Sequence, residues 1–280
     1  MAHDGQDMAM GQSILLDDLL ALTKAAIAPA ETVLEMARQS VRDTVEEDGR
    51  VSGRLIEENQ FAAHGLAWLA TYVESLRQMQ YWADKLTSEG SFGEVEALIH
   101  QIAFGEYLSQ IVGGIQMNQG EMVRLKDMGL GRDAVMSLCT DAVTTLMTGG
   151  NTQSARSRLV ELMQERSAEI TVGKTALDDE LEMIREQFRR YAVDKIEPFA
   201  HEWHLKDQLI PMEVIEELAE MGVFGLTIPE EYGGLGLGYT VYARILAVLS
   251  PACASTSTLM GAHQGIGLKA ILLRGTEEQK

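Results

Sequence analysis

The stretch IPEEYGGLGLG, residues 228–238, decides how the second half of this 280-residue chain is interpreted. Its glycines could form a phosphate-binding loop, a flexible linker or a rigid turn. A dinucleotide-binding loop has to leave a strand and open a helix, so that the helix N-terminus meets the pyrophosphate. Here an amphipathic helical pattern and an Ile-Pro pair precede the glycines, without a strand pattern. We therefore expect a tight turn between two helices, with glycines at positive φ.

Helical patterns surround this turn on both sides. Before it, a long helix is expected from residue 178 to the Ile-Glu-Pro at 196–198, and an amphipathic helix over 211–226. After it, helices are expected at about 239–250 and from Ser255 to about Arg274. The apolar residues recur at three- and four-residue spacing, which is typical of helices with one buried face. The second half is thus predicted to be all-α.

The order of these pieces resembles the N-terminal helical domain of the acyl-CoA dehydrogenase family. The matching motifs are Ile196-Glu197-Pro198-x-Ala200, Glu217-Leu218-x-x-Met221-Gly222-Val223-x-Gly225-Leu226, the stretch 228–238 and the final GTEEQK. Each motif alone is weak, whereas the set in this order is specific. The resemblance begins at residue 178 and runs to residue 280.

The resemblance implies a chemistry and a larger assembly. Members of the family oxidise an acyl-CoA to the 2,3-enoyl-CoA, as a glutamate removes the α-proton and the β-hydride passes to FAD. Electron-transferring flavoprotein then accepts the electrons, and the enzymes are homodimers or homotetramers. The family's β-barrel and C-terminal helical domains, which hold most of the FAD site and the catalytic base, are expected beyond residue 280. No catalytic residue is therefore assigned, and residues 1–280 alone should be inactive.

The first half is predicted to be a helical extension, residues 1–172, ahead of a dehydrogenase-like domain at 173–280. Its helical patterns, which suit an antiparallel bundle, cover 13–48, 54–87, 92–128, 133–148 and 152–170. Such an extension is similar to that of family members that oxidise (2S)-methylsuccinyl-CoA to mesaconyl-CoA in the ethylmalonyl-CoA pathway.

Local signals in the extension give further expectations. Pro29 should break or kink the first helix. Residues 46–50, EEDGR, should form a turn that pivots on Gly49. The pair Gly113-Gly114 should lie in the middle of a helix and weaken it.

The resemblance places one wall of the substrate pocket on the last predicted helix. The substrate-binding residues implied by it are Ala262, His263, Gln264, Gly265 and Ile266. His263 and Gln264 could donate hydrogen bonds to the free carboxylate of a dicarboxylic acyl group. Alternatively, this is an ordinary packed helix in which His263 bonds to the backbone.

The resemblance also implies an apolar pocket that docks electron-transferring flavoprotein. The residues implied are Val223, Leu235, Leu237 and Ile245. The alternative is ordinary packing under the glycine turn.

Composition excludes several classes of function. A net charge of −19 argues against nucleic-acid binding and against an anionic membrane surface. No apolar run reaches the ~18 residues of a membrane span, and the N-terminus lacks a targeting pattern. The two cysteines form no C-x-x-C motif, which fits a cytoplasmic protein. His201 and His204 in HEWH lack a third ligand, so no metal site is predicted.

The sequence leaves two hypotheses of different classes. The first is the front part of an FAD-dependent acyl-CoA dehydrogenase. The alternative is a non-catalytic helical module for assembly or docking that carries a dehydrogenase-like domain.

Overall fold

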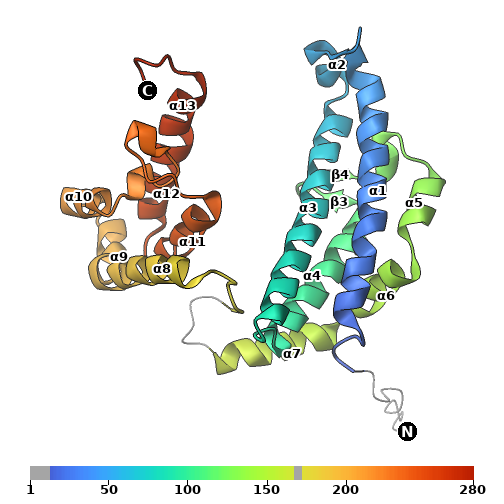
Figure 1. Cartoon of the computed structure of the whole chain (residues 1–280), viewed down its shortest axis with the longest axis horizontal. Helices are drawn as coiled ribbons and strands as arrows, with labels where there is room; N and C mark the ends of the chain where they lie inside the picture. The colour runs from blue at the N-terminus through green and yellow to red at the C-terminus, as the bar shows by residue number, and fades with distance from the viewer. Residues whose placement is uncertain (1–12, 167–171) are drawn as a thin grey trace. The chain divides into compact units, whose positions relative to one another are not determined.

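The computed structural model describes residues 13–166 and 172–280, shown in Figure 1. The targeting prediction for the N-terminal residues, and the end of the helix expected over 152–170, lie outside these ranges. The described residues form two compact units, which divide between Ala176 and Leu177. Both units are helical, and the strands among the described residues are two residues long and lie in the first unit, which confirms the all-α prediction.

The first unit is a bundle of long helices with two small hairpins. Its elements are α1 (Leu19–Val45), β1 (Glu46–Glu47), β2 (Arg50–Val51), α2 (Gly53–Glu58), α3 (Gln60–Ser88), α4 (Glu94–Gly113), β3 (Ile115–Gln116), β4 (Met122–Val123), η1 (Leu125–Met128), α5 (Arg132–Leu138), α6 (Asp141–Gly149) and α7 (Gln153–Glu165). The long helices α1 and α3 lie side by side, and α7 crosses the end of the bundle (Figure 1).

Regular spacing of apolar residues explains the bundle. On α1 the fully or nearly fully buried positions are Ala26, Ala30, Val33, Ala37 and Val41. These small side chains recur every three or four residues, which puts them on one face and lets α3 approach closely. The core they share with α3 and α4 is continuous from Leu19 to Leu146.

The prediction of a break at Pro29 is wrong, because α1 continues through this proline. A proline inside a helix removes one hydrogen bond and costs about 3 kcal/mol. The apolar face of α1 packs against α3 on both sides of Pro29, and this burial outweighs the local cost. The helix also begins at Leu19, after the predicted start at Ser13.

The prediction of a helix through Gly113-Gly114 is also wrong. The helix α4 ends at Gly113, and Gly114 adopts a φ of 133°, which favours glycine. The chain then turns into the antiparallel hairpin β3–β4. Two other predicted helices are each divided, at Asn59 and at Cys139-Thr140.

The turn expected at residues 46–50 is confirmed. Asp48 and Gly49 both have positive φ, 53° and 74°, and they connect β1 to β2 as a two-residue hairpin loop. Thr152, predicted to start a helix, caps α7 by accepting a hydrogen bond from the amide of Ala155 at 3.1 Å.

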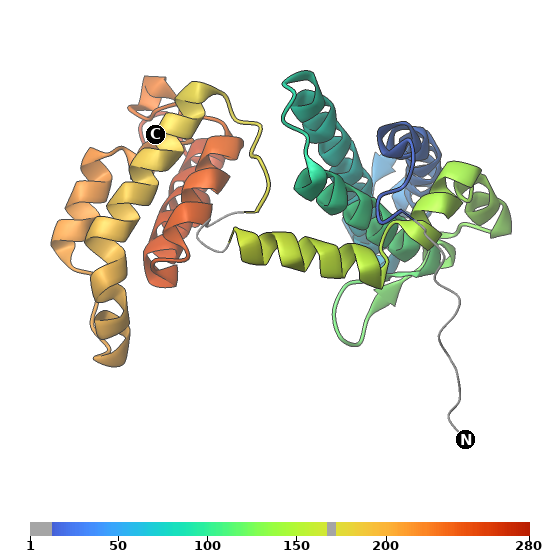
Figure 2. The ribbon, with the colours of Figure 1, turned by 90° about the horizontal axis from the view of Figure 1, so that it is seen from below.

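The second unit is a smaller, all-helical body. Its elements are α8 (Asp179–Tyr191), the π-helical turn η2 (Ala192–Ile196), α9 (Glu197–Leu205), α10 (Met212–Glu220), η3 (Val223–Gly225), η4 (Glu230–Tyr232), α11 (Tyr239–Leu249), α12 (Ala254–Ala262), the π-helical turn η5 (His263–Leu268) and α13 (Lys269–Arg274). Figure 2 shows α8, η2 and α9 along their length, with the red helices α11 to α13 beside them. The core is formed around Ile196, Leu218, Ile245 and Met260, all fully buried.

The glycine stretch is a rigid turn, as predicted. Gly233 and Gly236 have positive φ of 81° and 61°. A Cβ atom on Gly234 would lie 2.1 Å from the carbonyl oxygen of Ile228, so the backbone folds back on itself too closely for any side chain. This turn joins η4 to α11 and fixes where α11 begins.

Candidate functional site: an exposed helix face over a buried amide

One continuous helix carries the predicted substrate residues. It consists of α12, η5 and α13, and the residues Ala262 to Ile266 lie where the α-helix changes into the π-helical turn η5. Four of the five predicted residues are exposed: Ala262, His263, Gly265 and Ile266. The side chain of Ile266 is 82% exposed, an unusual state for an isoleucine in a helix. Together they form a small, largely apolar face, which we call the acyl face.

The fifth predicted residue, Gln264, points the other way, into the core, and is 2% exposed. Its Nε2 donates a hydrogen bond to the carbonyl oxygen of Val223 at 2.6 Å. Its Oε1 accepts from the backbone amide of Thr227 at 3.1 Å and from the Thr227 hydroxyl at 3.3 Å. Both polar atoms of the amide group are thus hydrogen-bonded inside the protein, and they connect the π-turn to the turn that precedes the glycine stretch.

His263 packs on an aromatic ring. Its imidazole lies edge-to-face on Phe224, with ring centroids 4.9 Å apart. The residue remains exposed to solvent on the acyl face. Of the predicted polar donors, His263 is the one that the structure leaves available to a ligand.

The four predicted docking residues are divided between core and surface. Val223 and Ile245 are fully buried and belong to the core of the second unit. Leu235 is 45% exposed and covers Gly222, and Leu237 is half-buried against the same core. Direct contact with a partner at this place is therefore available to Leu235 and Leu237.

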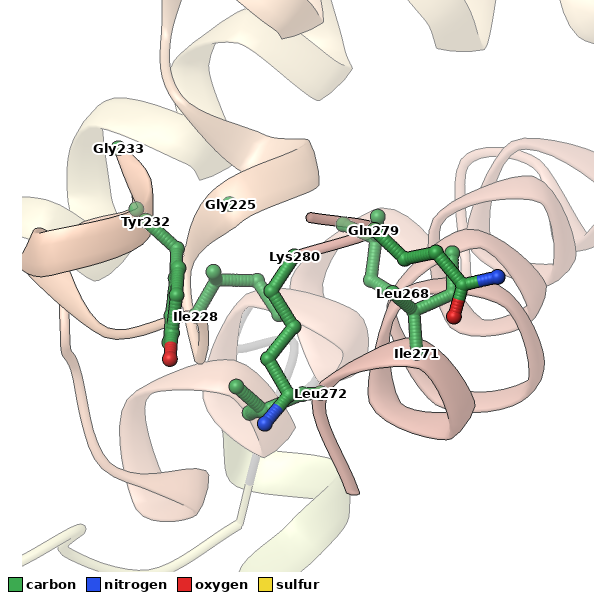
Figure 3. A pocket seen from close by; sticks show the side chains of 10 residues that line it. Gly225, Ile228, Tyr232, Gly233, Leu268, Ile271, Leu272, Gln279 and Lys280 are labelled. Atoms are coloured by element: carbon green, nitrogen blue, oxygen red, sulfur yellow. The ribbon is translucent and has the colours of Figure 1, made fainter. Parts of the chain in front are cut away.

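A separate hollow lies between the glycine turn and the last helix. It encloses about 590 Å³, open mouth included, and Figure 3 shows Tyr232 and Ile228 on one side with Leu268 and Ile271 on the other. Lys280 extends between them toward Leu272 (Figure 3). None of the five predicted substrate residues lines this hollow. The acyl face is thus an open wall, separate from the hollow.

The glycine turn does not present a phosphate cradle. Five backbone amides of the turn donate hydrogen bonds to backbone carbonyls of the same unit, at 2.7 to 3.2 Å. The donors are the amides of Gly233, Gly234, Leu235, Gly236 and Leu237. A pyrophosphate needs free amide groups that converge on it. These residues therefore do not fit the phosphates of FAD.

His201 and His204 lie on α9, where Trp203 between them stacks on Phe199. Within residues 13–166 and 172–280, no group of three or more His, Cys, Asp or Glu side chains is placed to hold a metal ion. In the same ranges, no helix combines the length and apolarity needed to cross a membrane.

Comparison with known proteins identifies the domain. Residues 178–280 match the family model for the acyl-CoA dehydrogenase N-terminal domain. The match starts one residue before α8 and includes the glycine turn and the acyl face. Residues 178–280 therefore belong to the acyl-CoA dehydrogenase N-terminal domain family.

Individual relatives are similar to the same domain, and one of them is also similar to the first unit. The chain is 52% identical over 266 residues to (2S)-methylsuccinyl-CoA dehydrogenase of Cereibacter sphaeroides, an alignment that covers 95% of this chain and 48% of that protein. Very long-chain specific acyl-CoA dehydrogenase of Rattus norvegicus is 40% identical over 99 residues, 34% of this chain and 15% of the relative. The chain thus spans about half the length of the first relative, and of these two alignments the first includes the helical extension.

Two residues that sequence reasoning missed complete the site. Phe224 supports the ring of His263, and Thr227 binds the amide of Gln264. Both lie in the segment that joins α10 to the glycine turn, about forty residues before the acyl face. An aromatic residue between two glycines, in Gly222-Val-Phe-Gly225, was the available signal, but it did not indicate its partner.

Proposed function

We propose that this chain is the front part of an FAD-dependent acyl-CoA dehydrogenase that oxidises (2S)-methylsuccinyl-CoA to mesaconyl-CoA. The observation that carries the proposal is the acyl face, an exposed strip of small and apolar residues with one accessible imidazole, in a chain 52% identical to a methylsuccinyl-CoA dehydrogenase. Bound FAD would supply the acceptor for the β-hydride of the acyl group. Polypeptide beyond residue 280 would hold the phosphates of FAD and would supply the base that removes the α-proton.

In this proposal the residues of the chain bind and orient the acyl group. Ile266 and Ala262 contact its carbon chain, and Gly265 leaves room for the methyl branch. His263 donates a hydrogen bond to the free carboxylate, which favours a dicarboxylic acyl group over a monocarboxylic one. These contacts exclude water from one side of the reacting carbons, and the other domains would close the opposite side.

Electron transfer to electron-transferring flavoprotein is proposed to use the surface around Leu235. Its exposed side chain and the half-buried Leu237 offer an apolar contact next to a rigid turn. Replacement of Leu235 by Ala should slow turnover with electron-transferring flavoprotein and leave turnover with a small artificial acceptor unchanged. Leu209→Ala is the matched control, since Leu209 is 91% exposed on another loop. Equal effects on both acceptors, or equal effects of both variants, would exclude this docking surface.

We further propose a cytoplasmic homodimer or homotetramer. The experiment that tests the proposed function is an assay of the protein at the full length of its relatives with methylsuccinyl-, butyryl- and isovaleryl-CoA. A yellow flavoprotein that acts preferentially on methylsuccinyl-CoA is expected. Activity on the straight-chain substrate alone would exclude the substrate assignment, and a flavin-free, inactive protein would favour a non-catalytic docking module.

A further inference from the structure

The π-helical turn η5 is the starting point. An α-helix has 3.6 residues per turn, so one inserted residue rotates the remainder of the helix by about 100° around its axis. The turn over His263–Leu268 therefore decides which residues of α12 and α13 share a face. In a regular α-helix without this turn, the acyl face would point in a different direction relative to α13 than it does here. Such turns are rare and need a local cause.

The side-chain amide of Gln264 is buried within this turn. Its hydrogen bonds to Val223 and Thr227 attach the π-turn to a segment that is itself fixed by the glycine turn. The partner groups are the carbonyl of Val223 and the amide of Thr227, and without the glutamine both would lose the hydrogen bond that its side chain supplies. The side-chain amide of Gln264 thus pairs with one donor, the amide of Thr227, and one acceptor, the carbonyl of Val223.

From this geometry we infer that Gln264 is a positioning residue for acyl-chain recognition and does not itself bind substrate. It keeps the π-turn in place, and the π-turn presents His263 and Ile266 toward the acyl group while Phe224 supports the imidazole. The carboxylate selectivity of the site then belongs to His263 alone. The identity of the ligand in this inference rests on the proposed function. The structural part, that Gln264 holds the π-turn in place, does not.

The structural part is tested in the 280-residue chain by amide hydrogen exchange. Gln264→Met keeps the length and apolar shape of the side chain but removes the hydrogen bonds, and Gln208→Met at an exposed position is the matched control. The amide of Thr227 should exchange about fivefold faster in Gln264→Met, as expected for one lost hydrogen bond, while amides in the core helix α11 stay unchanged. An equal increase throughout the second unit, or no change at Thr227, would overturn the inference.

The functional part is tested in the full-length holoenzyme. Gln264→Met should raise the KM for (2S)-methylsuccinyl-CoA about tenfold with little change in kcat. It should raise the KM for butyryl-CoA less, because that substrate loses only the apolar contact with Ile266. Gln264→Glu keeps the acceptor for Thr227 but places a second oxygen against the carbonyl of Val223, so it should not restore the loss. A similar loss for both substrates would overturn the positioning role. If the wild-type enzyme does not oxidise methylsuccinyl-CoA, the proposed function fails, whereas the exchange experiment still decides whether Gln264 holds the π-turn.

Discussion

The indole Nε1 of Trp82 donates a hydrogen bond at 2.9 Å to the carbonyl oxygen of Lys174. Two more contacts hold the same short segment on the bundle. The ammonium group of Lys85 donates to the carbonyl of Ala176 at 2.6 Å, and the amide of Lys174 donates to the carboxylate of the buried Glu96 at 2.9 Å. Residues 173–176, which connect the two units, are thus part of the first unit.

These contacts predict protection of the connecting segment from protease. Trp82→Phe keeps an aromatic ring but loses the N–H donor. The loss of one hydrogen bond weakens the attachment of the segment by about 1 kcal/mol. We expect trypsin to cleave after Lys174 about fivefold faster in this variant, because the segment leaves the bundle more often. Time courses followed by mass spectrometry measure the rate.

The matched control for this experiment is Trp68→Phe on the same helix, where the lost hydrogen bond goes to His64 within α3. Equal cleavage rates in Trp82→Phe and the wild-type protein, or equal acceleration in both variants, would show that the contact with Lys174 does not hold the segment.

A buried histidine predicts acid sensitivity of the bundle. His100 is fully buried among Trp82, Phe92 and Phe104, and burial lowers its pKa to about 4, although Asp84 opposes this shift. The unfolded chain has the ordinary pKa of 6.5, so it binds a proton more readily between pH 6.5 and 4. Stability from the neutral imidazole is therefore complete above pH 6.5 and is lost as pH falls toward 4.

The size of this effect can be measured by denaturant unfolding. From pH 7 to pH 5 the two pKa values imply a loss of about 2 kcal/mol in the free energy of unfolding. His100→Gln should remove most of that pH-dependent loss while lowering stability at pH 7, since the hydrogen bond between Nε2 and Thr23 is altered. His64→Gln at an exposed position should keep the wild-type profile. An unchanged pH profile in His100→Gln would contradict the assignment to His100.

Alanine substitutions at three glycines of the glycine turn should lower the stability of the second unit to three different degrees. Gly234→Ala should destabilise the second unit by more than about 2 kcal/mol, because its Cβ would overlap the carbonyl of Ile228 at 2.1 Å. Gly233→Ala should cost about 1 kcal/mol through its positive φ of 81° alone, as its surroundings are open. Gly238→Ala, with φ of −72° and open space, should be nearly neutral. Thermal unfolding measures the series, and a similar loss at all three positions would contradict the steric account.

Short-range signals in the sequence were sufficient for some elements and misleading for others. The glycine turn and the hairpin at Asp48-Gly49 depend on backbone angles that few residues allow, so their sequences indicate them directly. Pro29 does not break the helix, because its local penalty competes with a long buried face, which becomes visible only when α3 is in place. The burial of Gln264 depends on groups about forty residues away in the chain, and no local pattern reports such a partner.

The central claim is that the face around His263 is a wall of the acyl pocket, and single-turnover reduction of the flavin tests it most directly. The full-length protein and its His263→Leu variant are mixed anaerobically with (2S)-methylsuccinyl-CoA and with butyryl-CoA, and flavin bleaching is followed. The account predicts that the variant needs about tenfold more methylsuccinyl-CoA for half-maximal bleaching, the effect of one lost hydrogen bond to a charged group, with butyryl-CoA unchanged. Identical curves for variant and wild type would contradict it.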